Sequence, residues 1–164
     1  MEREYEQFLQ LFLPQPGYKV LDVTSHADEL TRIIETRIQP YDGRLSLAMY
    51  PGEHEAWEYS KTIEAHDIVS FGKPFRALAR DNDIVIIRDV LNRHEFPERI
   101  LKIIYQTLAN TGEIIIISKK GSVDIPLQLQ MLEEFEFRAA NSIDIFDKYD
   151  LVMAKKMHMW GNGL

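Results

Sequence analysis

The chain has 164 residues, of which 45% are hydrophobic and 27% charged, and its formal net charge at pH 7 is -7, values that fit one globular domain with a substantial core. The acidic balance argues against a nucleic-acid partner, because phosphate recognition requires clustered lysine and arginine. Cysteine is absent and no apolar run reaches membrane-spanning length, which excludes disulfides, thiolate metal sites and a membrane span, so we expect a cytoplasmic location.

The first half of the chain predicts helices alternating with strands. A helical apolar spacing opens the chain, formed by Tyr5, Phe8, Leu9 and Phe12. A buried strand is predicted over 18–23, a helix over 27–38 and a second strand over 44–50. Residues 53–66 are predicted as a helix and 67–71 as a short third strand. This order is typical of a parallel α/β sheet.

The second half predicts a βαβ crossover followed by a hairpin. Residues 83–90 and 113–118 are almost continuous apolar runs rich in β-branched side chains, as buried parallel strands require. The segment between them, 96–112, has a helical apolar stripe and a proline that suits a first helical turn. Asp124 is the expected N-cap of a helix over 125–135. Two further strands, the second at 149–156, are joined by a short turn and so run antiparallel.

Three stretches of this sequence carry a family resemblance. Residues 18–35, "YKVLDVTSHADELTRIIE", 81–118, from "DNDIVIIRDV" to "TGEIIIIS", and 132–156, "LEEFEFRAANSIDIFDKYDLVMAKK", are similar to the opening, middle and closing elements of class I S-adenosylmethionine-dependent methyltransferases. The resemblance implies an α/β fold: a three-layer, Rossmann-like, mostly parallel seven-stranded sheet with an antiparallel C-terminal strand. It implies one domain over 1–164, with an N-terminal helix (1–16), an α/β core (17–156) and a tail (157–164).

The resemblance also implies where a cofactor would bind, and the first such position is the turn after the opening strand. Thr24, His26 and Asp28 stand where the family has small residues, and Asp22 matches its acidic strand residue. A β-branched residue forced to positive φ costs roughly 1–2 kcal/mol, so we expect this turn to follow another path. Asp28 would also bring negative charge toward the carboxylate of S-adenosylmethionine.

The second and third strands depart from the family pattern as well. The family has an acidic residue for the ribose hydroxyls where this chain has Tyr50, and Glu53 would serve only if the turn between them folds back. Lys73 stands near the position of an acidic residue that meets the adenine amino group. Together with the first turn, these departures predict a degenerate cofactor site.

The loop after the fourth strand holds the candidate catalytic residues. In similar methyltransferases it lies beside the transferred methyl group, so Asp89 or His94 would act as the base; the alternative is a solvated loop. His26 and His94 form a conceivable two-histidine metal pair with no third ligand in view, and no metal site is assigned. His54 and His66 are expected at the surface, and Trp57 and Tyr59 in packing roles.

Two hypotheses for function follow. The sequence favours a methyltransferase-superfamily protein that has impaired or lost ordinary S-adenosylmethionine binding and has a non-catalytic or altered ligand- or partner-binding role. The alternative is a divergent, active S-adenosylmethionine-dependent methyltransferase acting on a small molecule. The tail residues Met157, Met159 and Trp160 either form an apolar surface for a protein partner or a second copy, or cover the sheet edge.

Overall fold

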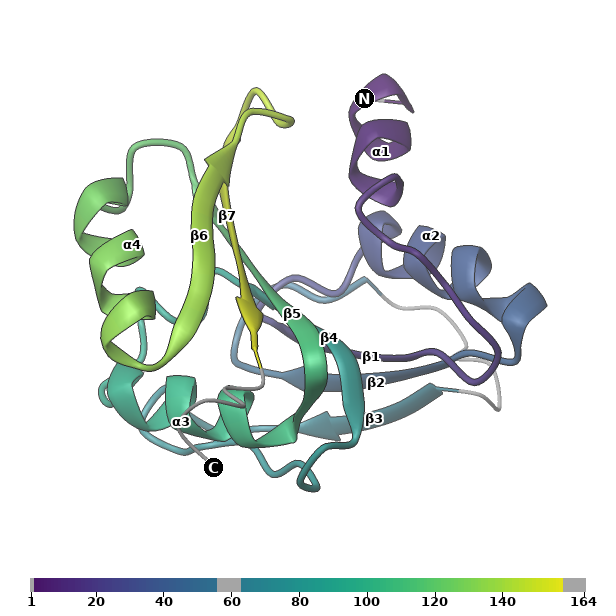
Figure 1. The fold of residues 1–164 in the computed structure, drawn as a ribbon, viewed down its shortest axis with the longest axis horizontal. Helices are drawn as coiled ribbons and strands as arrows, with labels where there is room; N and C mark the ends of the chain where they lie inside the picture. The colour runs from purple at the N-terminus through teal and green to yellow at the C-terminus, as the bar shows by residue number, and fades with distance from the viewer. Residues whose placement is uncertain (1, 56–62, 158–164) are drawn as a thin grey trace.

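The computed structural model describes residues 2–55 and 63–157. Within them lies a seven-stranded sheet with strand order β3-β2-β1-β4-β5-β7-β6 (Figure 1). All neighbours pair in parallel except β7, which runs antiparallel to both β5 and β6. This is the predicted α/β sheet. Its strands are β1 (Lys19–Thr24), β2 (Arg44–Met49), β3 (Ile63–Asp67), β4 (Asn82–Arg88), β5 (Leu108–Lys119), β6 (Phe137–Ile143) and β7 (Tyr149–Lys156).

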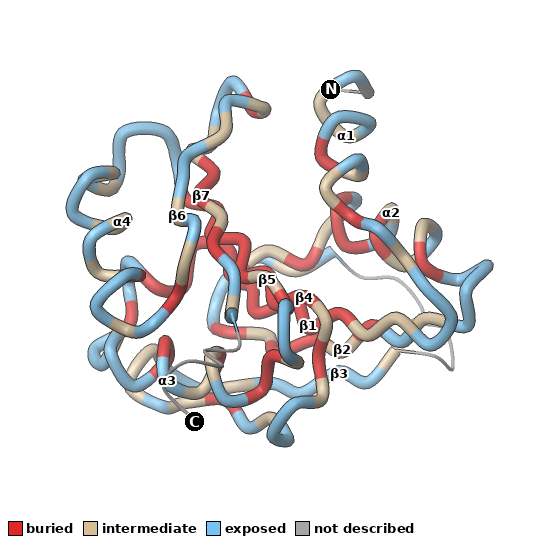
Figure 2. The backbone as a smooth tube through the Cα atoms, viewed as in Figure 1, coloured by how far each residue is buried: buried red, intermediate tan, exposed pale blue. Residues whose placement is uncertain are grey.

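Helices cover both faces of this sheet and complete the three layers (Figure 1). One face packs against α1 (Glu2–Leu9) and α2 (Glu29–Ile38), and the other against α3 (Pro97–Thr107) and α4 (Ile125–Glu134). A short 3-10 turn, Gln39–Tyr41, follows α2. The central strands are buried along their length (Figure 2), which explains their continuous apolar sequence. No helix of the described ranges is long and apolar enough to cross a bilayer.

Two aspartates start helices as N-caps. The Asp124 carboxylate accepts a hydrogen bond from Leu127 N at 3.1 Å, as predicted for the start of α4. Asp28 does the same for α2, where its Oδ1 accepts from Leu30 N at 3.0 Å. The second cap places a carboxylate beside the turn that follows β1.

Three predicted elements are wrong in part: the helix over 53–66, the strand over 67–71 and the helix over 96–112. The third strand is Ile63–Asp67, so 63–66 are not helical and the strand does not lie at 67–71; pairing with β2 overrides the local pattern. Residues 56–62 of the predicted helix, with Trp57 and Tyr59, lie outside the described residues. Similarly, α3 ends at Thr107 and the chain continues directly into β5, where 96–112 was predicted as helical.

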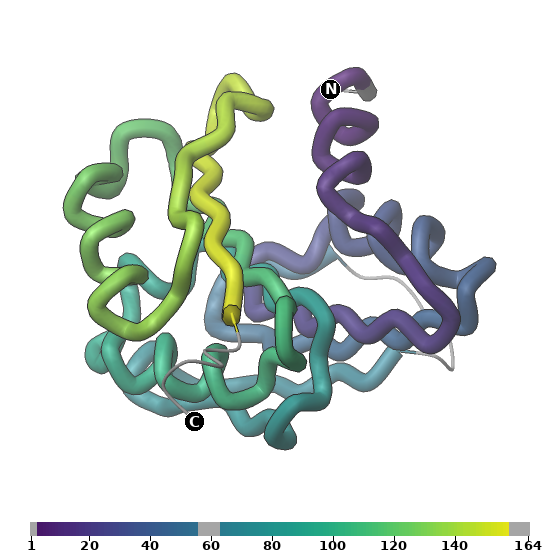
Figure 3. Tube along the Cα trace, in the orientation of Figure 1, coloured from purple at the N-terminus to yellow at the C-terminus, as the bar shows by residue number. Residues whose placement is uncertain are grey.

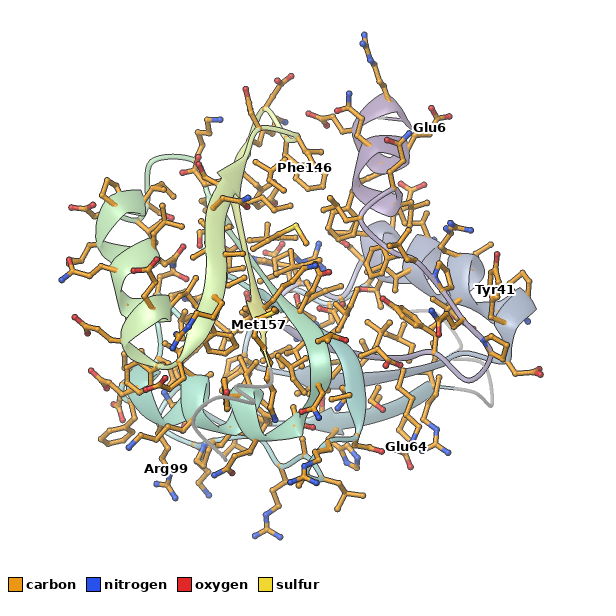
Figure 4. All side chains as sticks on the ribbon, in the orientation of Figure 1. Glu6, Tyr41, Glu64, Arg99, Phe146 and Met157 are labelled. Carbon is orange, nitrogen blue, oxygen red and sulfur yellow. The ribbon has the colours of Figure 1, made fainter. Side chains whose placement is uncertain are left out.

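The N-terminal helix packs against the tip of the β6–β7 hairpin (Figures 3 and 4). The rings of Phe8 and Phe146 have centroids 5.6 Å apart, and Asp147 N donates a hydrogen bond to Glu4 Oε1 at 2.8 Å. The pKa of the nearby Tyr5 hydroxyl is raised, mainly by burial and to a lesser extent by the negative charge of Asp28. Thus α1 is held near the carboxyl ends of the central strands.

Candidate functional site

The carboxyl ends of β1, β2 and β4 meet at one edge of the sheet, where open α/β sheets bind ligands. The backbone links these ends directly: Tyr50 N donates to Thr24 O at 2.9 Å, and Ser25 N donates to Arg88 O at 3.4 Å. The sequence-predicted positions on these ends are therefore neighbours.

A buried arginine dominates this edge. Arg88, the last residue of β4, is 4% exposed, and its guanidinium donates to Thr24 Oγ1 at 3.1 Å, to Asp28 Oδ1 at 3.0 Å and to the carbonyl oxygen of His26. We call these four residues the Arg88 cluster. Its ion pair with Asp28 joins β4 to the start of α2. The guanidinium thus fills the inside of the turn that follows β1.

The turn itself is built without glycine geometry. None of residues 24–28 has a positive φ, so Thr24, His26 and Asp28 are unstrained. Thr24 Oγ1 accepts from His26 N at 2.9 Å, which tightens the turn from within. The turn therefore follows a path that requires no glycine, and side-chain oxygens supply the contacts that stabilise it.

Below the Arg88 cluster lies a buried carboxyl group. Asp22 Oδ2 accepts from Thr31 Oγ1 at 3.1 Å, and Oδ1 has no hydrogen-bond partner. Burial raises the pKa of Asp22 to about 6, and the nearby Arg88 charge works in the opposite direction. The Asp22 carboxyl therefore lies in the interior between β1 and α2.

Residues 50–55, which follow β2, fold back over the turn after β1. Glu55 N donates to Ala27 O at 2.8 Å. The His54 ring accepts from Ala27 N through Nδ1 at 3.0 Å, so its Nε2 carries the proton donated to Tyr50 O at 2.7 Å. Gly52 lies so close to the carbonyl of Ser25 that a Cβ there would overlap it. Half-buried His54 is therefore a bridge between two turns, and the expectation that it is a surface residue is wrong.

A second cluster lies beside this segment. The buried Tyr50 hydroxyl donates to Lys73 O at 2.6 Å, and burial raises its pKa to about 12. Its ring stacks on Phe71 with centroids 5.5 Å apart and meets the His94 ring edge-on at 5.7 Å. Lys73 and Glu53 are exposed residues, and Lys73 contributes its backbone carbonyl to the cluster.

Both ring nitrogens of His94 are engaged within this cluster. Phe96 N donates to Nδ1 at 2.9 Å, and Nε2 then donates to Lys73 O at 3.1 Å. The side chain is 7% exposed. In this arrangement His94 holds the loop after β4 against the loop after β3 and has no free nitrogen for a substrate or a metal.

Asp89 is the other candidate catalytic residue, and it is locked in place. Its φ is 52°, a left-handed value in which aspartate is tolerated. The Oδ1 atom accepts from Lys119 N at 3.0 Å, while the buried Oδ2 has no hydrogen-bond partner and lies 3.8 Å from His26 Nε2. The structure therefore brings His26 to Asp89 and leaves His94 in a separate cluster.

Other predicted positions contribute little to this site. Among residues 2–55 and 63–157, no group of three metal-ligating side chains lies close enough to hold an ion. His66 is exposed on β3, as expected. Met157 is 41% exposed, whereas Met159 and Trp160 lie outside the described residues.

Sequence reasoning missed the two residues that organise the site. Arg88 carried a usable signal, because an arginine ending a strand of buried apolar residues requires nearby acceptors, and the turn after the neighbouring strand β1 contains the acidic residue Asp28. His54 carried none, since its partner Ala27 N is a backbone group 27 positions away.

Comparisons with known proteins match the fold and not the sequence. No family model and no curated protein matches this chain. Among solved structures, a SAM-dependent methyltransferase from Aquifex aeolicus is 15% identical with a TM-score of 0.73, over 93% of this chain and 89% of that one. A chain of the complex between the Haloferax volcanii Trm112 methyltransferase activator and the putative methyltransferase is 9% identical with a TM-score of 0.72, over 96% and 91% of the two chains.

Human N-acetylserotonin methyltransferase, solved in complex with SAM, is also similar. It is 16% identical with a TM-score of 0.66, over 94% of this chain and 52% of that one. At such identities the likeness concerns the fold alone. The chain therefore has the class I methyltransferase fold, as its sequence resemblance implied.

Proposed function

We propose that this chain is a methyltransferase-fold binding protein that has lost ordinary S-adenosylmethionine binding and acts through a protein partner. The carrying observation is Arg88, whose buried guanidinium occupies the inside of the turn after β1. In the family that turn offers bare backbone to the cofactor. Here the side chains of Thr24 and Asp28 and the carbonyl of His26 already accept hydrogen bonds from Arg88.

The position of residues 50–55 supports the same proposal. This segment covers the turn through Gly52 and through hydrogen bonds from Glu55 and to His54. A nucleoside lying between the ends of β1 and β2 would have to displace it. The residues present do not fit S-adenosylmethionine in the family's usual position, so we derive no transfer step through it.

The hydrogen-bonding groups at the end of β2 differ from those of the family. Tyr50 directs its only hydroxyl to Lys73 O, so this hydroxyl is engaged within the protein. Glu53 lies in the segment that folds back over the turn after β1 and is exposed, so its carboxylate is the remaining candidate acceptor for ribose hydroxyls at this strand end. The sequence argument that Asp28 repels the carboxylate of S-adenosylmethionine needs a correction, because Arg88 pairs with Asp28 and offsets its charge. The larger obstacle to cofactor binding is then the space that Arg88 occupies, and the smaller is charge repulsion.

A protein partner is favoured by the neighbour solved in a complex with an activator protein, because it places this fold within a two-protein assembly.

A specific observation favours the alternative, an active methyltransferase: Asp89 Oδ2 is buried without a hydrogen-bond partner beside His26. Such a carboxylate has the free lone pair that a general base needs. His94 has no corresponding free atom.

Thermal unfolding with added cofactor separates the two functions. A ligand present at one hundred times its dissociation constant stabilises a protein by about 2.7 kcal/mol. We expect no change in melting temperature with S-adenosylmethionine or S-adenosylhomocysteine, and a clear rise for an active methyltransferase measured in parallel. A comparable rise for this chain would favour the enzyme and reject the proposal.

A further inference from the structure

The two edges of the sheet differ in how well they are protected against pairing with another strand. At the β6 edge, the register shifts between Arg138 and Asn141, and Ala139 has a φ of 56°; such a bulge discourages further pairing. The β3 edge is regular: its five residues pair with β2 without a register shift. Among the described residues, no strand lies on the outer side of β3.

The outward backbone groups of β3 can be assigned from one hydrogen bond. Ile68 N donates to Met49 O at 2.8 Å, so even-numbered residues here direct their backbone groups at β2. Because these directions alternate along a strand, Ile63, Ala65 and Asp67 direct theirs away from the sheet. The edge that residues 2–55 and 63–157 leave unpaired therefore offers three residues with N–H and C=O groups in the correct spacing for an antiparallel strand.

The side chains of β3 select which strand would fit. Glu64, His66 and Asp67 are exposed, and Glu64 lies at the rim of the molecule in Figure 4. In an antiparallel pair of two β3 strands centred on Ala65, Glu64 of one copy lies opposite His66 of the partner subunit. A register shifted by one residue on each strand places Glu64 opposite itself, where like charges repel. The opposite shift places His66 opposite itself and loses both Glu64–His66 pairs.

We infer that β3 is a homodimerisation edge, at which two copies of this chain pair antiparallel about Ala65 and join their sheets. Ala65 pairs with Ala65 of the partner subunit and exchanges both backbone hydrogen bonds, as does Ile63 with Asp67 of the partner subunit. Glu64 and His66 of the partner subunit form a non-hydrogen-bonded pair, in which side chains approach most closely. The arrangement has two-fold symmetry, as closed dimers require.

Dimerisation by this edge would also place two hollows side by side. A hollow of about 790 Å³ lies on the α3 face of β2 and β3, and both Glu64 and His66 line it. Residues 68–81, which connect β3 to β4, contain no helix to fill that face. The two-fold axis is perpendicular to the joined sheet and keeps both hollows on one face.

The test is sedimentation equilibrium of the full chain and three variants. We expect a reversible dimer for the wild type. Ala65→Pro removes an outward N–H without touching the bonds to β2 and should give a monomer. Glu64→Lys should raise the dimer dissociation constant about tenfold, because both symmetric carboxylate–imidazole pairs are lost. The double variant Glu64→Lys/His66→Glu again places a carboxylate opposite a nitrogen donor in both pairs and should restore most of the affinity.

Circular dichroism and thermal melting show whether each variant is folded, so that loss of the dimer can be distinguished from loss of the fold. Residues 64 and 66 are exposed, so their substitution leaves the core intact even if Ala65→Pro loosens β3. A wild type that stays monomeric up to its solubility limit overturns the inference. So does a dimer that Ala65→Pro and Glu64→Lys leave unchanged, since its interface would then lie elsewhere, for instance around exposed Met157.

Discussion

Substituting Arg88 by methionine tests whether this arginine closes the turn after β1. Methionine keeps much of the aliphatic packing and removes the guanidinium, which donates to Thr24, His26 and Asp28. Hydrogen bonds that involve a charged group contribute about 1.5–3 kcal/mol each and are not additive, and breaking a buried ion pair costs about 3–5 kcal/mol. The Asp28 side chain is 36% exposed, so water can solvate its carboxylate in the variant, which favours the lower end.

We therefore expect Arg88→Met to lower the free energy of unfolding by about 3 kcal/mol. For a chain of this size that corresponds to a fall in melting temperature of roughly 6–12 °C. Urea unfolding followed by circular dichroism measures the first quantity, and calorimetry the second. The variant should remain folded at low temperature, because the hydrophobic core on both faces of the sheet is unchanged.

Two controls make this prediction specific. Arg99 is exposed on α3 (Figure 4), and Arg99→Met should change stability by less than about 0.5 kcal/mol. Arg88→Lys keeps the charge but cannot donate to three separated acceptors from one planar group, so it should recover less than half of the loss. If Arg88→Met loses no more stability than Arg99→Met, or if Arg88→Lys is as stable as the wild type, the assigned role is wrong.

Three further outcomes are expected. Burial raises the pKa of Asp22 to about 6, so ionisation of this carboxyl lowers the stability of the wild type as the pH rises. The free energy of unfolding of Asp22→Asn, relative to that of the wild type, should therefore increase by about 2–3 kcal/mol between pH 4 and pH 7. A difference in urea unfolding that does not change with pH would contradict this. Replacing His54 by alanine should cost about 1–2 kcal/mol, because a backbone N–H and a carbonyl lose their partner, whereas Glu53→Ala at an exposed position should cost almost nothing; equal melting temperatures would remove the bridge from the account. Tyr50→Phe should lose only about 1 kcal/mol, because Lys73 O still accepts from a histidine, and a loss above about 3 kcal/mol in urea unfolding would require a further role for the hydroxyl.

Most of the fold could be predicted because its signals are local. Central strands such as β4 are continuous apolar runs, and helices such as α2 carry an apolar stripe, so each element identifies itself within about ten residues. The edge strand β3 is the exception. Its sequence, IEAHD, has only two apolar residues, Ile63 and Ala65, on one face and leaves four of its five residues exposed, so the apolar pattern is weak, and the strand is extended because β2 provides its hydrogen bonds.

The site could be predicted by position but not by contact. The sequence pattern placed Asp22 on the opening strand and Asp28 at the start of the next helix, where the structure has them. The groups that replace the glycines come from distant parts of the chain: Arg88 is 60 positions from Asp28. Sequence patterns give the residue type at each strand end. Which acceptors Arg88 reaches depends on how the ends of β1 and β4 lie together in the folded sheet.

The central claim is that the chain itself occupies the place of the cofactor, and isothermal titration calorimetry tests it most directly. Wild-type protein is titrated with S-adenosylmethionine and with S-adenosylhomocysteine, and an active class I methyltransferase serves as the positive control. Under conditions that saturate the control, the account predicts that this chain gives heats of dilution and no heat of binding. Saturable micromolar binding of either compound to the wild type would contradict it.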